Sequence, residues 1–218
     1  MLLSVTTGLV DAVSVLGLGK VFTANMTGNI VFLGFAVAGA PGFDAGHCFL
    51  AITAFLVGAA LGGRVGKAHV GRSLRRWLLT SALIETVLLW LGAAFAVGLN
   101  RASAPSEPDV YAVIALTALA MGYRNATIRQ LKVPDLTTTV LTLTLTGLAA
   151  DSGLAGGGSP NRARRLGAVA AIFAGAALGA LLIIHAGLAI PLALCGGLVL
   201  AGTFACVAHP AAAMPAHG

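Results

Sequence analysis

The sequence predicts an all-α polytopic membrane protein with about six net transmembrane crossings, arranged as two three-span halves. Composition is the first reason: 58% of the 218 residues are hydrophobic, 9% are charged, and the mean hydropathy is +0.95. Soluble domains carry roughly 25% charged residues, so this chain cannot cover a water-facing surface. The second reason is that short sequence patterns occur twice, about half a chain apart.

Two patterns are repeated. Residues 8–12 (GLVDA) resemble residues 122–126 (GYRNA), 114 positions later. Residues 58–62 (GAALG) recur unchanged as residues 175–179, 117 positions later. The second pattern has small residues four apart, which let helices approach closely, so we expect it to serve packing. An internally repeated membrane protein with polar residues inside its spans is a common layout for transporters.

These repeats predict the domain organisation. We expect a single membrane domain over residues 1–218, with repeat 1 at 1–100 and repeat 2 at 108–208. Residues 209–218 are expected to form a flexible tail.

Long apolar stretches mark the elements, because about 18 or more apolar residues are needed to cross a bilayer. Residues 45–63, 166–184 and 188–208 contain no Asp, Glu, Lys or Arg, and residues 77–99 contain one such residue, Glu85. Each first segment is longer and counts as one net crossing. In chain order the expected crossings are 1–40, 45–63, 77–99, 110–150, 166–185 and 188–208.

Loop charge predicts the orientation. The loop at 64–76 carries five Lys or Arg residues and the stretch at 162–165 carries three, so both are expected in the cytoplasm. The stretches at 41–47 and 185–189 contain no Lys or Arg residue. Three crossings in each half then make the halves inverted repeats, with both termini in the cytoplasm.

A second count stays open. Residues 2–19 and 21–40 are each long enough for a full span, as are 110–123 and 136–150. That reading gives eight helices in parallel repeats.

Polar residues interrupt the first segment of each half. Residues 20–29 (KVFTANMTGN) place two Asn, two Thr and a Gly in an apolar stretch, just after Gly17 and Gly19. The second copy has Pro134 followed by a run of threonines. Such breaks are tolerated in a membrane where the freed backbone groups are buried or line a cavity. A half-helix that starts there presents its N–H groups to an anion.

We expect the two breaks to meet near the middle of the membrane and to form a binding site for a small polar or anionic solute. One possibility is that Asp11 pairs with Arg124; the alternative is that Arg124 lies at the cytoplasmic surface and only sets topology. Glu85 has no acidic counterpart in the second half, which makes it a candidate proton carrier, although a structural hydrogen bond also fits. The candidate solute-binding residues are Asp11, Thr23, Asn25, Thr27, Asn29, Arg124, Asn125, Thr137, Thr138 and Thr139.

Residues 8–14 (GLVDAVS) and 22–29 (FTANMTGN) resemble the signature of the YoaK-like family of small bacterial inner-membrane proteins, a domain of unknown function with about six spans. The resemblance covers nearly the whole chain in length and span order, and its most specific part is residues 23–29. It implies a bacterial cytoplasmic-membrane location and carries over no substrate.

The leading functional hypothesis is a secondary transporter or permease. The alternative is a non-transporting membrane module that binds lipid or a partner protein, and it predicts that the polar residues satisfy one another. An enzyme is not expected, because the sequence has no nucleophile–base pair, metal-ligand spacing or cofactor fingerprint. No cofactor or metal is expected. The partners expected are the lipid bilayer, a small-molecule solute and a second copy of the chain in a homodimer. Nucleic acid is excluded despite the net charge of +6, because the basic residues cluster beside the spans.

Overall fold

The computed structural model describes residues 1–101, 106–131, 141–158 and 161–208. These residues form eight α-helices and one short 3-10 helix, so the all-α prediction is confirmed. The helices are α1 (Leu2–Gly17), α2 (Met26–Val37), α3 (Ala45–His69), α4 (Leu74–Arg101), α5 (Glu107–Gln130), α6 (Leu141–Ala150), α7 (Arg162–Ala186) and α8 (Ala189–Val207), and the 3-10 helix is η1 (Gly153–Ala155).

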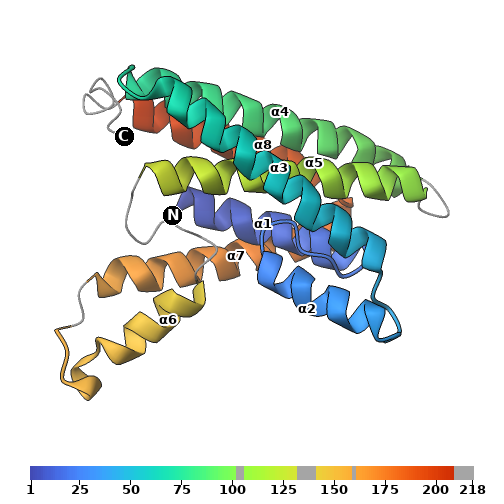
Figure 1. Cartoon of the computed structure of the whole chain (residues 1–218), viewed down its shortest axis with the longest axis horizontal. Helices are drawn as coiled ribbons and strands as arrows, with labels where there is room; N and C mark the ends of the chain where they lie inside the picture. Colours follow the sequence, from blue (N-terminus) through green and yellow to red (C-terminus); the bar gives the residue numbers. More distant parts are fainter. Residues whose placement is uncertain (102–105, 132–140, 159–160, 209–218) are drawn as a thin grey trace.

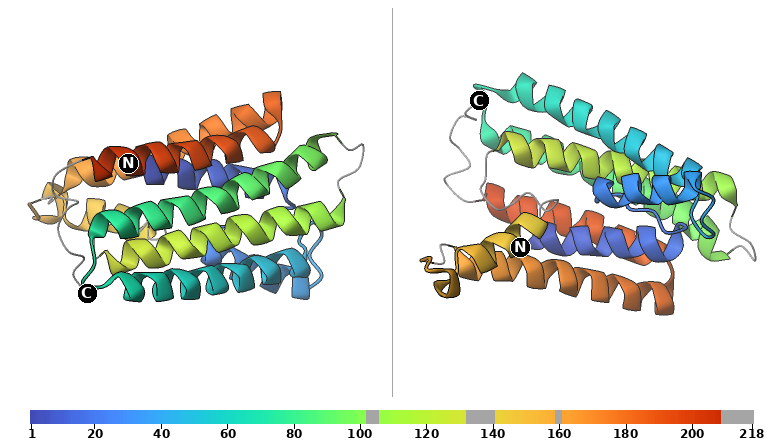
Figure 2. Two further views of the ribbon diagram at one scale, coloured as in Figure 1. Left: turned by 90° about the horizontal axis from the view of Figure 1, so that it is seen from above. Right: turned by 60° about the horizontal axis from the view of Figure 1, so that its bottom comes forward.

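The longer helices and α1 lie side by side in one elongated bundle, and the short helices α2 and α6 lie at its margin (Figure 1). Helix α1 begins and α8 ends at the same end of the bundle, and α1 and α5 run in opposite directions (Figures 1 and 2). We call this end, which also holds the α3–α4 connection, the basic end, because the clusters at 64–76 and 162–165 lie there.

Four helices, α3, α4, α7 and α8, are long and apolar enough to cross a membrane. Helix α5 is as long as these, but it carries Glu107, Asp109, Arg124 and Arg129. Helices α1, α2 and α6 are apolar but shorter, with 10 to 16 residues. The expected first segment at 1–40 is therefore two helices, α1 and α2.

Helix α3 and helix α5 touch backbone to backbone. A Cβ added to Gly58 of α3 would collide with the carbonyl oxygen of Leu119, and one added to Gly122 of α5 would collide with that of Phe55. Glycines therefore set the distance between the two axes.

Helices α1 and α7 repeat this arrangement. A Cβ on Gly175 of α7 would collide with the carbonyl oxygen of Val5, and one on Gly8 of α1 would collide with that of Ile172. Val5 and Gly8 of α1 lie 114 positions before Leu119 and Gly122 of α5. Ile172 and Gly175 of α7 lie 117 positions after Phe55 and Gly58 of α3. The expected packing role of the glycine patterns is confirmed.

The first helix of each half thus packs on a long helix of the other half: α1 on α7, and α5 on α3. Helices α4 and α8 pack on each other at the centre, and they also contact α5 and α1. The core between them is apolar, and its fully buried side chains include Leu9, Val13, Ile114, Met121 and Leu192. Large apolar side chains also cover the outer faces, among them Phe173, Ile184 and Leu143. This exposed apolar surface suits a lipid environment.

Candidate functional site

The chain breaks between α1 and α2, as the polar sequence there predicts. Helix α1 ends at Gly17, and two residues with positive φ, Gly19 at +85° and Lys20 at +57°, turn the chain back. Gly19 lies against the ring of His47 at the end of the bundle away from the basic end, and the Nζ of Lys20 lies 5.3 Å from the centre of the Phe43 ring. The chain then returns toward the middle of the bundle before α2 begins (Figure 1).

Asn29 fixes this returning segment. Its Oδ1 accepts from the backbone N–H of Phe22 at 2.8 Å, and its Nδ2 donates to the carbonyl oxygen of the same residue at 2.5 Å. The side chain is fully buried. Asn29 was expected to bind solute, but the structure places it in the backbone hydrogen bonds of the break, and it lines neither cavity described below.

Asn25 caps the start of α2, where its side-chain oxygen accepts from the backbone N–H of Gly28 at 3.5 Å. Both Asn25 and the neighbouring Thr27 are exposed. These two residues, together with Ala24, line two cavities, one on each side of the break.

The first cavity, which we call the α5 cavity, has a volume of about 700 Å³ and lies between the break, α3 and α5. Its polar lining from α5 consists of Asn125, Arg129 and Gln130. Gln130 donates from Nε2 to the carbonyl oxygen of Gly63 at 2.9 Å, and its Oε1 is buried without a hydrogen-bond partner.

The second cavity, which we call the α1 cavity, has a volume of about 430 Å³ and lies between α1, the break, α2, α6 and α7. Thr7 and Asp11 of α1 line it, together with Thr142 of α6. Asp11 and Asn125 occupy matching positions in the two sequence copies, and the structure puts each in the wall of one of the two cavities.

The side chains of Asp11 and Thr23 each contain an oxygen atom that lacks a hydrogen-bond partner in the protein. The Oδ1 of Asp11 and the Oγ1 of Thr23 are buried and have no hydrogen-bond partner. The Asp11 carboxyl group faces the backbone of Ala24 in the returning segment. Buried polar groups normally have partners, so these two atoms are free to take part in a further hydrogen bond.

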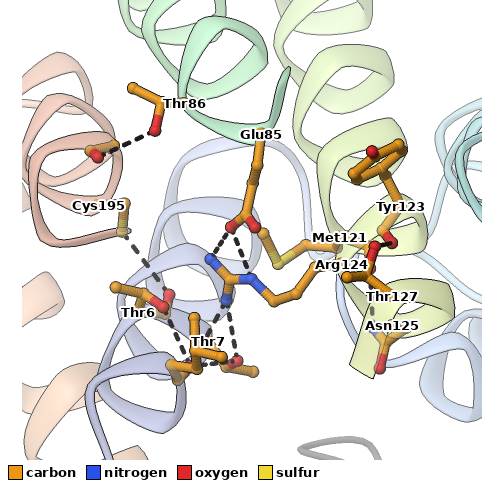
Figure 3. A network of polar contacts seen from close by, with 12 residues as sticks. Thr6, Thr7, Glu85, Thr86, Met121, Tyr123, Arg124, Asn125, Thr127 and Cys195 are labelled. Carbon is orange, nitrogen blue, oxygen red and sulfur yellow. Dashed lines mark hydrogen bonds and ion pairs between the residues drawn. The ribbon is translucent and has the colours of Figure 1, made fainter. Parts of the chain in front are cut away.

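Arg124 lies in the centre of the bundle and pairs with Glu85 of α4 (Figure 3). Its Nε donates to Glu85 Oε1 at 2.6 Å, and its Nη2 donates to the same oxygen. Its Nη1 reaches the hydroxyl of Thr7 at 3.4 Å. Only 2% of Arg124 and 5% of Glu85 is exposed.

This pair corrects both expectations for Arg124. The partner of Arg124 is Glu85 and not Asp11, and Arg124 is buried in the core rather than placed at the cytoplasmic surface. The reason is geometric: successive residues on a helix point about 100° apart, so Arg124 and Asn125 face different neighbours. Asn125 faces the α5 cavity, whereas Arg124 faces α4 and α1.

Of the predicted site residues, the structure brings together Asp11, Asn25, Thr27 and Asn125 around the two cavities. Thr23 is buried beside them, and Arg124 and Glu85 form a separate pair. The predicted Thr137, Thr138 and Thr139 lie outside the described residues, as does the expected tail at 209–218.

Sequence reasoning missed Thr7 and Gln130 as site residues. Thr7 and Asp11 are four residues apart and therefore share one helix face, which was a usable signal. No such pattern distinguishes Gln130, because its role depends on the approach of α3 at Gly63.

Apolar helices of spanning length, with a buried ion pair and polar cavities between them, define a polytopic α-helical membrane protein. Residues 1–205 match the family described as "Protein of unknown function (DUF1275)", and the chain belongs to this family. It is 36% identical over 152 residues to the "UPF0700 transmembrane protein YoaK" of Bacillus subtilis (strain 168), which confirms the resemblance to the YoaK-like family. That match covers 69% of this chain and 64% of the relative, less than two thirds of the relative's length. No solved structure matches the chain.

Proposed function

We propose that the protein is a secondary transporter or permease of a small polar or anionic solute in the bacterial cytoplasmic membrane, without catalytic activity. The observation that carries the proposal is that Asn25 and Thr27, at the start of a half-helix at the margin of the bundle, line a cavity on each side. Solute sites of many transporters lie at such broken helices, where a helix N-terminus and polar side chains converge.

The packing supports inverted repeats with six net crossings. The α3–α5 and α1–α7 interfaces use equivalent glycines against equivalent carbonyl oxygens, and α1 and α5 run in opposite directions. In this proposal α1 with α2, and α5 with α6, each make one broken crossing.

Charge supports the orientation. The basic end holds the start of α1, the end of α8, and the Lys and Arg clusters beside α3, α4 and α7. By the positive-inside rule this end is cytoplasmic, which puts both termini inside.

The two cavities differ in the chemistry that they offer. Among its described lining residues, Arg129 is the charged group of the α5 cavity, where it lies with the amides of Asn25, Asn125 and Gln130. A guanidinium and several amide groups suit an oxyanion such as a carboxylate. The anionic part of the solute is therefore assigned to the α5 cavity.

The alternative function, a membrane module that binds lipid or a partner protein, requires polar residues that satisfy one another. Arg124, Glu85 and Asn29 fit this requirement, since each has a partner in the protein. The unpartnered atoms of Asp11, Thr23 and Gln130 beside the cavities favour the transporter. Neither function requires the homodimer, which remains a prediction.

Water access to the break tests the proposal. Cysteine replaces Asn25 or Thr27 in a Cys206→Ala background, since Cys206 is the exposed one of the three native thiols. Both cysteines should react with a charged methanethiosulfonate reagent. Ile30→Cys is the matched control, because Ile30 is on the same helix but on its apolar outer face, where 58% of it is exposed. Protection of Asn25→Cys and Thr27→Cys from both sides of the membrane would favour the module. Transport itself is tested by proteoliposome uptake over a broad solute panel, in which Asn25→Ala should abolish any uptake found.

A further inference from the structure

Among the described residues, two carboxyl groups lie inside the bundle, the buried one of Glu85 and the partly buried one of Asp11, and their surroundings differ. Glu85 is bound by two nitrogens of Arg124 and lines neither cavity. The Glu85 carboxylate is the counter-charge of the buried Arg124 guanidinium, and its loss would leave that charge unpaired. Glu85 is therefore poorly suited to the proton-carrying role that its sequence position suggests.

Asp11 has the opposite environment. It lines the α1 cavity, and its Oδ1 is buried without any hydrogen-bond donor. An ionised carboxylate removed from water is costly unless a counter-charge or several donors surround it. A proton bound to the carboxyl group removes that cost, and the cavity beside it provides a place for water to deliver and accept the proton.

We propose that Asp11 is the site at which the protein takes up and releases a proton. The inference deepens the proposed function, because it names the proton as the coupling ion of the same site. The step is a simple transfer: a hydronium ion that reaches the α1 cavity breaks one of its O–H bonds and gives the proton to an Asp11 carboxylate oxygen, which leaves a water molecule and a neutral carboxyl group. Release reverses this step.

Among the described residues, the charged groups of the elements around Asp11 either have another partner or lie at the ends of their helices. On α5, Arg124 donates to Glu85 and reaches α1 only at Thr7 and the carbonyl oxygen of Leu3. Within their described bounds α2 and α6 contain no titratable side chain. On α7, Arg162, Arg164 and Arg165 lie at the start of the helix and His185 at its other end, and Arg165 pairs with Asp151. On α8, the Cys195 thiol donates to the carbonyl oxygen of Thr6. In the break, Lys20 lies over the Phe43 ring.

The second sequence copy strengthens the assignment. At the position equivalent to Asp11 stands Asn125, whose Nδ2 donates to the carbonyl oxygen of Met121 at 2.8 Å. An amide cannot titrate, so one cavity of the two carries a protonatable group at this position. Proton binding at Asp11 therefore changes the charge of the α1 cavity, whereas Asn125 stays neutral in the α5 cavity.

The experiment is infrared spectroscopy of the full chain in lipid nanodiscs, between about pH 5 and pH 9. Exposed aspartates ordinarily titrate near pH 3.9, so they remain ionised over roughly this whole range. The probe is the C=O stretching band of a protonated carboxyl group. We expect this band at low pH and its loss as the pH rises. Labelling of aspartate with carbon-13 at the carboxyl carbon should shift the band, whereas a band of Glu85 would stay in place.

Asp11→Asn should remove the band, and Asp44→Asn is the control that should leave it, because Asp44 is an exposed helix cap. If Asp11→Asn does not fold, the isotope shift in the unmodified chain still decides between aspartate and glutamate. Four results would overturn the inference: no acid band at any pH, a band that persists unchanged at every pH, a band that ignores aspartate labelling, or a band that survives in a folded Asp11→Asn variant. Failure of transport assays with an intact Asp11 band would instead count against the proposed function alone.

Discussion

The Nε of Arg124 donates to Oε1 of Glu85 at 2.6 Å in the centre of the helical bundle. The pair joins α5 to α4, and through Thr7 it also reaches α1. Breaking a buried ion pair by removing one partner typically costs about 3–5 kcal/mol, because the other charge stays buried.

We therefore expect Glu85→Gln to lower the free energy of unfolding by about this amount, about 3 kcal/mol or more, as measured by denaturant unfolding in detergent micelles. The double substitution Glu85→Leu with Arg124→Met should regain most of the loss. The control is Asp151→Asn, which breaks the more exposed pair with Arg165 and should cost at most about 1 kcal/mol. Equal stability of Glu85→Gln and the unmodified chain would contradict the pair's structural role.

The equivalent glycines predict equivalent defects. Gly58→Leu should push α3 away from α5, and Gly175→Leu should push α7 away from α1. Overpacking of this kind costs roughly 1–3 kcal/mol, and we expect similar losses of melting temperature for the two variants. Gly34→Leu is the control, since a Cβ at Gly34 meets nothing within 4 Å. A large loss at one interface with none at the other would argue against equivalent packing.

The two asparagines of the break should behave differently. Asn29→Ala removes both side-chain bonds to Phe22 from a buried site and should cost about 1–3 kcal/mol. Asn25→Ala removes one long, exposed capping bond and should cost less, about 0.5 kcal/mol. Thermal unfolding gives the stabilities, and hydrogen exchange should show faster exchange at residues 20–25 in Asn29→Ala only. Identical exchange in the two variants would refute the role assigned to Asn29.

Topology is testable with two single cysteines in the Cys206→Ala background. Six net crossings place Gly42 on the outside and Gly158 on the inside, so impermeant thiol reagents should label them from opposite faces of sealed vesicles. Labelling of both cysteines from the outside would favour the eight-helix count.

The helical class and the interruption after Gly17 could be predicted from sequence, because both follow from local composition: apolar stretches of spanning length, and Gly, Asn and Thr where they end. The partner of Arg124 could not be predicted from the sequence. The duplication matched Asp11 with Asn125 and drew attention to Arg124 beside it, but Glu85 has no counterpart in the second copy, and nothing in the repeat indicates that α4 lies next to Arg124. Partner choice between helices depends on tertiary packing, which a single sequence pattern does not encode.

The roles within the polar segment 20–29 were also only partly predictable. Asn25 and Asn29 are four residues apart and have the same side chain. Asn25 nevertheless lines both cavities, whereas Asn29 binds the backbone of Phe22. The difference arises because the chain folds back at Gly19 and Lys20, which brings Phe22 over Asn29.

The pairing of α1 with α7 has a consequence for biosynthesis. Helix α1 leaves the ribosome before its partner α7, which begins only at Arg162, so α2 to α6 must be translated before the two can meet. Until then Thr7 and Asp11 lack the α7 wall that closes their side of the bundle. Helix α1 therefore waits in the translocon or the surrounding lipid, and this part of the bundle closes only after α7 has been synthesised.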